Sequence, residues 1–133
     1  MEQDPKIYIG IDWGRKRIGL SIADSETRLP MPLSSVGNLK AVNEAIKEEG
    51  ATTVVLGAPI PMTGRGDLDP EFINFSKRLS ESNPDIKIEQ IDERLSSKQA
   101  DSLPGHKSDK ASRDEVSAML ILQTFLDKNG RDI

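Results

Sequence analysis

The chain has 133 residues, 35% of them hydrophobic and 30% charged, with a net charge of −4, which is typical of one globular domain, expected to span residues 1–133. The absence of Cys excludes disulfides, thiolate zinc sites and Cys nucleophiles, and a single His disfavours Ser/His hydrolase chemistry. No apolar run approaches the ~18 residues that span a bilayer and residues 1–6 are no signal peptide, so we expect a cytoplasmic protein without a membrane partner.

Two strands and a tight turn open the chain. Residues 7–13 and 17–23 alternate apolar with small or polar side chains, and the turn between them contains Gly14. This pattern predicts a β-hairpin. A third strand is expected over residues 33–36, after the interruption at Pro32.

A helix and a buried strand follow the hairpin. Apolar residues recur at helical spacing from Leu39 to Ile46, with Asn38 as the expected N-cap and Gly50 as the C-terminal stop. The run TTVVLGAP, residues 52–59, is continuous and rich in β-branched side chains. Such a run is expected for a strand that is buried on both faces in a parallel pairing.

The second half of the chain predicts two more helices with a strand between them. Asp69 and Pro70 are the expected N-cap and first residue of one helix, and IKIEQID, residues 86–92, is the strand. Ser112 and Glu115 match a capping box, which predicts that the last helix begins directly after Ser112. The predicted order is three strands, helix, strand, helix, strand, helix.

Three acids fall at the ends of predicted elements, where open sheets build their sites. They are Asp12 after the first strand, Glu93 after the last strand and Asp114 in the first turn of the last helix. Carboxylates brought together with few neutralising partners need a divalent cation, and oxygen ligands favour Mg²⁺ or Mn²⁺ over zinc. Two such ions about 4 Å apart can clamp the attacking and leaving oxygens of a phosphodiester.

Each acid also has a simpler structural explanation. An acid at the second position of a capped helix interacts favourably with the helix dipole by ~0.3–1 kcal/mol, which alone would explain Asp114. Asp12 close to Gly14 is typical of a turn, and Glu93 can be one more solvated charge. The hypothesis of a site therefore depends on the three acids together.

Basic residues gather beside the proposed acids. Between residues 94 and 113, five Lys or Arg stand against two Asp, a local charge of +3. We expect such cations to bind a phosphate backbone. A solvated loop is the simpler explanation for any single lysine, and for Arg17 the alternative is an ion pair with a neighbouring acid. His106 is expected on a surface loop, with proton transfer to a leaving group as the alternative. The candidate phosphate-binding residues are Arg15, Lys16, Arg17, Arg94, Lys98, Lys107, Lys110 and Arg113.

Four motifs occur in order along nearly the whole chain. They are GIDWGRKRIGLSIAD (10–24), VVLGAP (54–59) followed by a Gly-containing loop, DERLSS (92–97) and DEVSAMLILQTFLD (114–127). Together they resemble the YqgF family, also called RuvX, the pre-16S rRNA nucleases related to Holliday junction resolvases. The resemblance implies an α/β, ribonuclease H-like fold: a mixed five-stranded sheet, three antiparallel strands continued by two parallel ones, with helices on both faces.

The resemblance also implies a function. Asp12, Glu93 and Asp114 would be the metal-binding catalytic acids of a Mg²⁺- or Mn²⁺-dependent nuclease that matures the 5′ end of 16S rRNA. Structured RNA would be its substrate and ribosomal precursor particles its partners. The loop IPMTGRGD, residues 60–67, departs from the family pattern, in which an Asn and an Asp-Gly pair are usual.

Other functions fit parts of this pattern. Four-way DNA junctions are the alternative substrate, because phosphate contacts do not distinguish the sugars. A resolvase that cuts two symmetric strands needs a homodimer, whereas an end-processing ribonuclease can act as a monomer. The motif GIDWG also resembles the first phosphate loop of actin-like ATPases and sugar kinases, which need two such domains. A non-catalytic nucleic-acid- or protein-binding module would keep the fold without the reaction.

Overall fold

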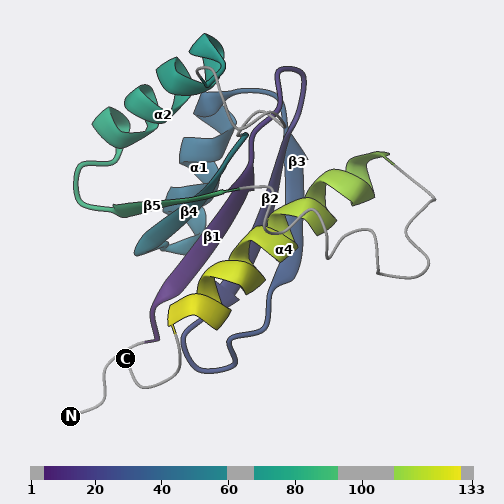
Figure 1. Ribbon diagram of the computed structural model, residues 1–133. Coiled ribbons are helices and arrows are strands. Elements are labelled where there is room, and N and C mark those ends of the chain that lie inside the picture. Colours follow the sequence, from purple (N-terminus) through teal and green to yellow (C-terminus); the bar gives the residue numbers. More distant parts are fainter. Residues whose placement is uncertain (1–4, 60–67, 93–109, 130–133) are drawn as a thin grey trace.

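A mixed five-stranded sheet forms the centre of the protein (Figure 1). The computed structural model describes residues 5–59, 68–92 and 110–129, with side chains from residue 113 onward in the last range. The strands are β1 (Ile7–Asp12), β2 (Ile18–Asp24), β3 (Met31–Val36), β4 (Thr53–Ala58) and β5 (Lys87–Asp92). Their spatial order is β3-β2-β1-β4-β5, with antiparallel pairing from β3 to β1 and parallel pairing from β1 to β5. The sheet implied by the family resemblance is therefore confirmed.

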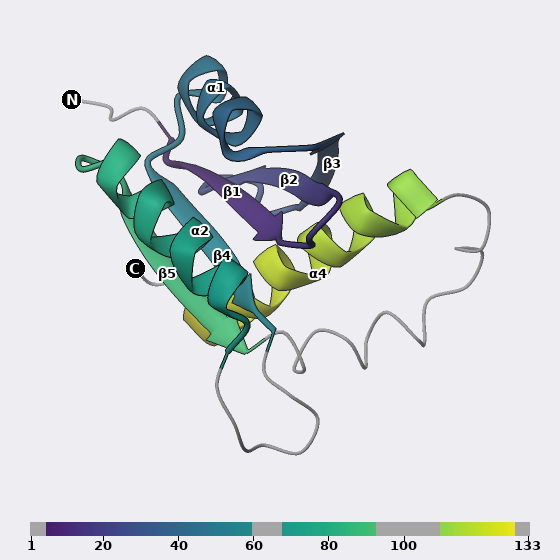
Figure 2. The same cartoon turned by 90° about the horizontal axis from the view of Figure 1, so that it is seen from above.

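Helices cover both faces of this sheet (Figures 1 and 2). On one face, α1 (Leu39–Glu49) and α2 (Pro70–Ser82) enclose the larger core, while α4 (Lys110–Asn129) crosses the other face. Between the two layers, β4 is buried along its whole length, as its continuous apolar run predicts. None of the described helices combines the length and the apolar character needed to cross a bilayer.

The ends of α1 and the start of α2 follow the predicted local signals. The Asn38 side chain accepts a hydrogen bond of 2.9 Å from the Ala41 N–H, and Gly50 ends α1 with a left-handed φ of 67°. The Asp69 side chain accepts a hydrogen bond of 2.9 Å from the Glu71 N–H at the start of α2. These three capping predictions are confirmed.

Strand β3 is longer than predicted. It begins at Met31, so Pro32 lies inside the strand instead of before it. Proline lacks a donor for a sheet ladder, but β3 is an edge strand, and its register against β2 shifts between Leu20 and Ser21. Edge strands and irregular pairings are the places where a sheet accepts proline.

Helix α4 begins two residues before Ser112, so the predicted capping box is wrong. A capping signature is a local preference of ~1 kcal/mol, which extension of a helix by a further half-turn can outweigh. Asp114 is consequently the fifth residue of α4, and no acid lies in the first turn of this helix. Because the dipole effect is confined to the first turn, it does not explain Asp114.

Candidate active site

Asp12 is the last residue of β1, at the carboxyl end of the central strand. Its register partners are Gly19 on β2 and Gly57 on β4. Because glycine has no side chain, Asp12 carries the only side chain in this row of paired residues across the three strands. Alternation along β1 places Asp12 on the same face as Tyr8, which packs beneath α4, whereas Ile11 enters the core beneath α1 and α2. Asp12 is half-buried and faces the layer that α4 occupies.

Helix α4 comes into backbone contact with the sheet at the same row. A Cβ built on Gly19 would lie 2.5 Å from the carbonyl carbon of Asp114, a separation that only glycine allows. One turn further along, the buried Ser21 hydroxyl donates a hydrogen bond of 2.8 Å to the Ala118 carbonyl. Because Gly19 is the register partner of Asp12, this contact brings Asp114 to the same row and face as Asp12.

The carboxylate of Asp114 is paired with a cation. Its Oδ2 lies 2.8 Å from Nε of Arg17, and the Ser35 hydroxyl donates to the same oxygen at 3.5 Å. The Asp114 side chain is 22% exposed and that of Arg17 is 46% exposed, so solvent reaches both groups. The pairing of Arg17 with a neighbouring acid, the alternative that its position before a strand suggested, is present.

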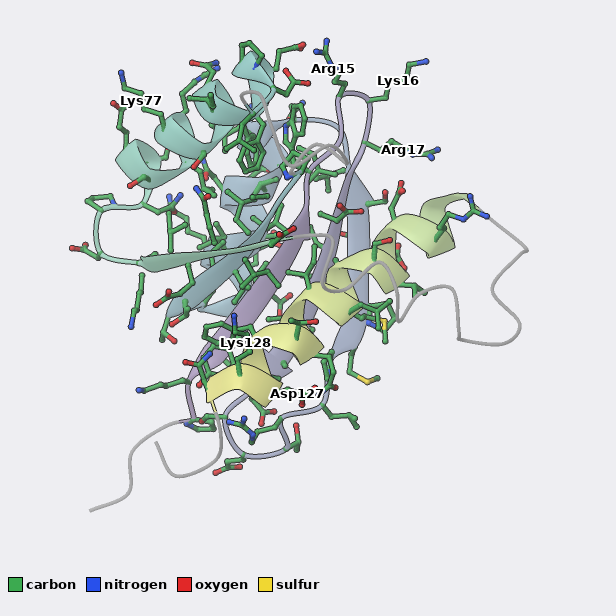
Figure 3. The ribbon with its side chains drawn as sticks, viewed as in Figure 1. Arg15, Lys16, Arg17, Lys77, Asp127 and Lys128 are labelled. Carbon is green, nitrogen blue, oxygen red and sulfur yellow. The ribbon has the colours of Figure 1, made fainter. Side chains whose placement is uncertain are left out.

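The turn between β1 and β2 carries the other two cations of the first motif (Figure 3). Arg15 lies against the start of α2, with 2.8 Å to Asp69 and 3.0 Å to Glu71. Lys16 is exposed at the tip of the turn and points away from the sheet. The link from Arg15 to α2 spans 54 positions of sequence and was not predicted.

The remaining predicted site residues divide into two groups. Arg113 is exposed on α4 directly before Asp114, and Lys110 is the first residue of that helix. Five residues lie outside the part of the chain that the structure describes: Glu93, Arg94, Lys98, Lys107 and the alternative proton donor His106. Glu93 follows the last residue of β5 directly in the sequence.

The oxygen donors of the site fit a hard divalent cation. Asp12 and Asp114 supply two carboxylates on one face, and the described part of the chain contains no His or Cys that could add a nitrogen or thiolate ligand. Within residues 5–59, 68–92 and 110–129, no group of three or more potential metal ligands occurs. A complete site therefore requires at least one ligand from outside these ranges or from the substrate.

Asp24, the last residue of β2, is an acid with a structural role. The Asp24 carboxylate accepts hydrogen bonds from the backbone N–H groups of Thr27 and Glu26 at 2.7 and 2.9 Å and from the Thr27 hydroxyl. The bond from the Thr27 N–H contributes most to holding the pKa of Asp24 below its ordinary value of 3.8. In the same turn, Arg28 donates a hydrogen bond of 2.6 Å to the Leu126 carbonyl in the last turn of α4.

The sequence reasoning did not assign a role to Gly19. A glycine inside a strand signals close approach of another backbone, and this signal was present in the first motif. What could not be predicted was which element approaches, because the contacting residue Asp114 is 95 positions away along the chain.

A family model described as RuvX, Holliday junction resolvase, matches residues 6–128. The chain belongs to the RuvX family. This membership confirms the resemblance carried by the four motifs and the prediction of a nuclease, a hydrolase of phosphodiester bonds. Nucleases of this fold generally use a divalent metal ion, in agreement with the donor set at Asp12 and Asp114.

Two chlamydial relatives are similar to the RuvX chain over most of its length. The protein of Chlamydia trachomatis serovar L2 is 36% identical over 135 residues, which are 90% of each chain. That of Chlamydia abortus is 32% identical over 144 residues, covering 97% of the RuvX chain and 95% of the relative. Both are named "Putative pre-16S rRNA nuclease".

Solved structures of a resolvase share the fold. Thermus thermophilus RuvC in complex with a Holliday junction substrate superimposes with a TM-score of 0.59 at 12% identity, covering 95% of the RuvX chain and 97% of that chain. A second structure of Thermus thermophilus RuvC gives a TM-score of 0.56 at 10% identity, covering 86% and 92%. The predicted ribonuclease H-like fold is thus confirmed.

Proposed function

We propose that this RuvX-family chain cleaves phosphodiester bonds of precursor 16S rRNA in the cytoplasm, using Asp12, Glu93 and Asp114 as its catalytic acids. The observation that carries the proposal is the meeting of Asp12 and Asp114 at one row and one face of the sheet. We assign Glu93 as the third acid because it directly follows the last residue of β5 in the sequence.

The three acids would hold Mg²⁺ or Mn²⁺. Such an ion supplies Lewis-acid stabilisation of the phosphate and lowers the pKa of water, so that hydroxide is available near neutral pH. The glycines beside Asp12 let α4 approach the sheet closely, with the Asp114 backbone over Gly19 and the Ile121 side chain over Gly57. Arg17, held against Asp114, would bind a non-bridging phosphate oxygen next to the acids.

The exposed cations would hold the rest of the substrate. Lys16 at the tip of the β1–β2 turn and Arg113 on α4 flank the acids and are open to solvent. Arg94, Lys98, Lys107 and Lys110 belong to the basic stretch that precedes or begins α4 and would contact phosphates further along the strand. Arg15 would contribute only after exchanging Asp69 and Glu71 for phosphate.

Cleavage of a 5′-extended precursor 16S rRNA in Mg²⁺ or Mn²⁺ tests the proposal. We expect Asp12→Asn to reduce the rate at least ~10²-fold, because it removes a charged ligand from the site. Asp127→Asn is the matched control, since Asp127 is an exposed acid in the last turn of α4, far along the helix from Asp114 (Figure 3). Equal cleavage by the parent and Asp12→Asn would refute the proposed function.

The family description and the shared fold favour resolution of four-way DNA junctions as the second candidate. The same assay with a four-way junction in place of RNA compares the two substrates directly. The mass in solution adds a second criterion, because symmetric cleavage of two strands needs a homodimer and end processing of rRNA can proceed with a monomer. Faster cleavage of the junction by a dimeric protein would favour the resolvase function.

A further inference from the structure

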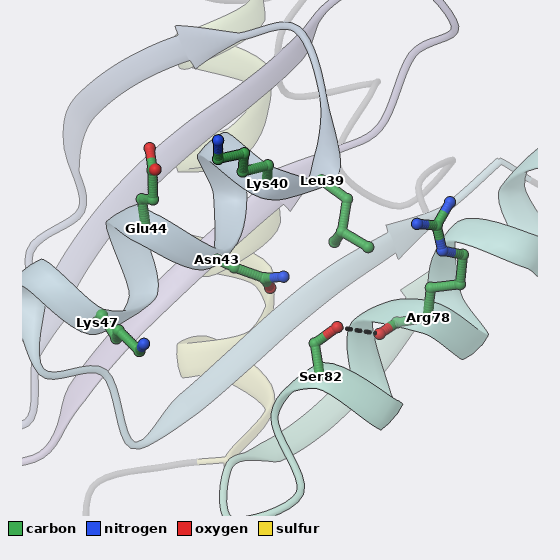
Figure 4. Close-up of a pocket in the computed structure, with 7 residues that line it drawn as sticks. All are labelled: Leu39, Lys40, Asn43, Glu44, Lys47, Arg78 and Ser82. Atoms are coloured by element: carbon green, nitrogen blue, oxygen red, sulfur yellow. Dashed lines mark hydrogen bonds between the residues drawn. The ribbon is translucent and has the colours of Figure 1, made fainter.

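Two adjoining clefts lie on the face of the sheet opposite Asp12. The first, of about 490 Å³, opens beside the β1–β2 turn and is lined by residues that include Trp13, Asn38, Asn74 and Phe75. The second lies between α1 and α2 and is lined by Lys40, Asn43, Glu44, Lys47 and Ser82 (Figure 4). Leu39 and Arg78 line both clefts, so the clefts adjoin; together they are named the α1–α2 groove.

The α1–α2 groove carries unneutralised positive charge. The ion pairs among the described residues use Arg15, Arg17 and Lys87, so Lys47 and Arg78 are paired with no acid in that part of the chain. Among the residues that line the second cleft, three cations, Lys40, Lys47 and Arg78, stand against the one acid Glu44, and in the close-up Lys47 points from α1 toward α2 (Figure 4). In a chain of net charge −4, the groove is a locally cationic surface that would attract an anionic ligand.

An aromatic ring lies at one end of this groove. Trp13 is half-buried and packs edge-on against Phe72, with ring centroids 5.7 Å apart. It follows Asp12 directly in the chain, yet its side chain joins the core beneath α1 and α2 while that of Asp12 faces α4. The consecutive residues Asp12 and Trp13, at the carboxyl end of β1, therefore present a carboxylate to one face of the sheet and an indole to the other.

We propose that the α1–α2 groove binds a single-stranded segment of the RNA substrate, with a base stacked on Trp13 and the backbone phosphates on Arg78 and Lys47. The proposal rests on the proposed nuclease function and extends it to a second contact surface. Unpaired bases stack on aromatic side chains and their phosphates follow a cationic groove, and the amides of Asn43 and Asn74 can hydrogen-bond base edges. Within a duplex the base faces are stacked on one another, so base-paired RNA would offer no free base to stack on Trp13.

The chain provides its own optical probe, because Trp13 is its only tryptophan. A single-stranded oligouridylate of eight nucleotides, titrated in EDTA to prevent cleavage, should quench the tryptophan fluorescence. An abasic ribose-phosphate oligomer of the same length should not quench it, because it has phosphates but no bases. Arg78→Gln should weaken the RNA titration about tenfold, the effect of losing one charge-assisted contact.

Lys77→Gln is the matched control for this charge change. Lys77 precedes Arg78 on α2, is exposed, and lines neither cleft (Figure 3). Absence of quenching by RNA, or equal weakening by Arg78→Gln and Lys77→Gln, would refute the groove. Equal quenching by polyglutamate would also refute it, in favour of an acidic protein partner.

The two proposals fail in different experiments. Asp12→Asn should reduce cleavage at least ~10²-fold and keep the fluorescence quenching, while Arg78→Gln should raise KM for the rRNA precursor and keep kcat. Full cleavage by Asp12→Asn refutes the proposed function whatever the fluorescence shows. Normal KM in Arg78→Gln refutes the groove even if Asp12→Asn is inactive.

Discussion

Replacement of Gly19 by alanine tests whether backbone contact with β2 positions Asp114. The added methyl would lie 2.5 Å from the carbonyl carbon of Asp114 and 3.0 Å from its Cβ. Ordinary contact begins near 3.4 Å and the carbonyl oxygen of Asp114 lies closer still, so α4 has to move by at least about 0.9 Å at this point. Overpacking of this kind costs ~1–3 kcal/mol of unfolding free energy, and a displacement of ~1 Å at a catalytic group can reduce the rate about 10²-fold.

Two measurements separate the consequences of Gly19→Ala. Urea denaturation gives the loss of stability, and kcat on the rRNA precursor, measured well below the urea midpoint and at a temperature where the variant is folded, gives the loss of positioning. Gly37→Ala is the control, because a Cβ there meets no atom within 4 Å; since Gly37 lines the α1–α2 groove, the comparison of activities uses kcat and not KM. If Gly19→Ala is as stable and as active as Gly37→Ala, the seating of α4 on β2 does not position Asp114.

Three further variants test separate features of the structure. Asp24→Asn should lower the unfolding free energy at neutral pH. A folded-state pKa below 3.8 gives stability that is present above pH 3.8 and is lost in acid, so the difference between the variant and the parent should disappear as pH falls through the lowered pKa of Asp24. A difference that stays constant with pH in urea titrations would contradict this. Gly50→Ala should cost ~1 kcal/mol in the same titrations because φ is 67°, and an unchanged midpoint would argue against the left-handed cap. Arg17→Gln should change the unfolding free energy by less than ~1 kcal/mol, since solvent reaches the ion pair with Asp114. It should raise KM and reduce the slope of log affinity for RNA against log salt concentration by about 0.7. An unaltered slope would mean that Arg17 pairs with Asp114 and does not contact phosphate.

Elements with strong local signals could be predicted from the sequence. The β-hairpin, the buried strand β4 and the caps at Asn38, Gly50 and Asp69 depend on periodicity, β-branched content and capping chemistry within a few residues. The start of α4 was predicted wrongly because the Ser112 and Glu115 signature is equally local, and the helix begins two residues before it.

The candidate site depends on contacts that are distant in the sequence. Asp12 could be singled out as an acid at a strand end, but the position of Asp114 at the same row and face depends on the close approach of α4 to Gly19. The pairing of Arg15 with Asp69 is likewise tertiary, and nothing near Arg15 in the sequence indicates it. Charge patterns therefore identified candidate residues, while the sheet register decided which of them meet.

Helix α4 is attached to β2 and the residues flanking it by Arg17 and Gly19 at Asp114, by Ser21 at Ala118 and by Arg28 at Leu126. Twelve positions separate the first of these attachments from the last, about 18 Å of helix. Removal or insertion of one residue between them would shift one attachment by about 1.5 Å and rotate it by about 100° around the helix axis. Natural variation in chain length should consequently avoid residues 114–126, and alignments of relatives should place gaps elsewhere.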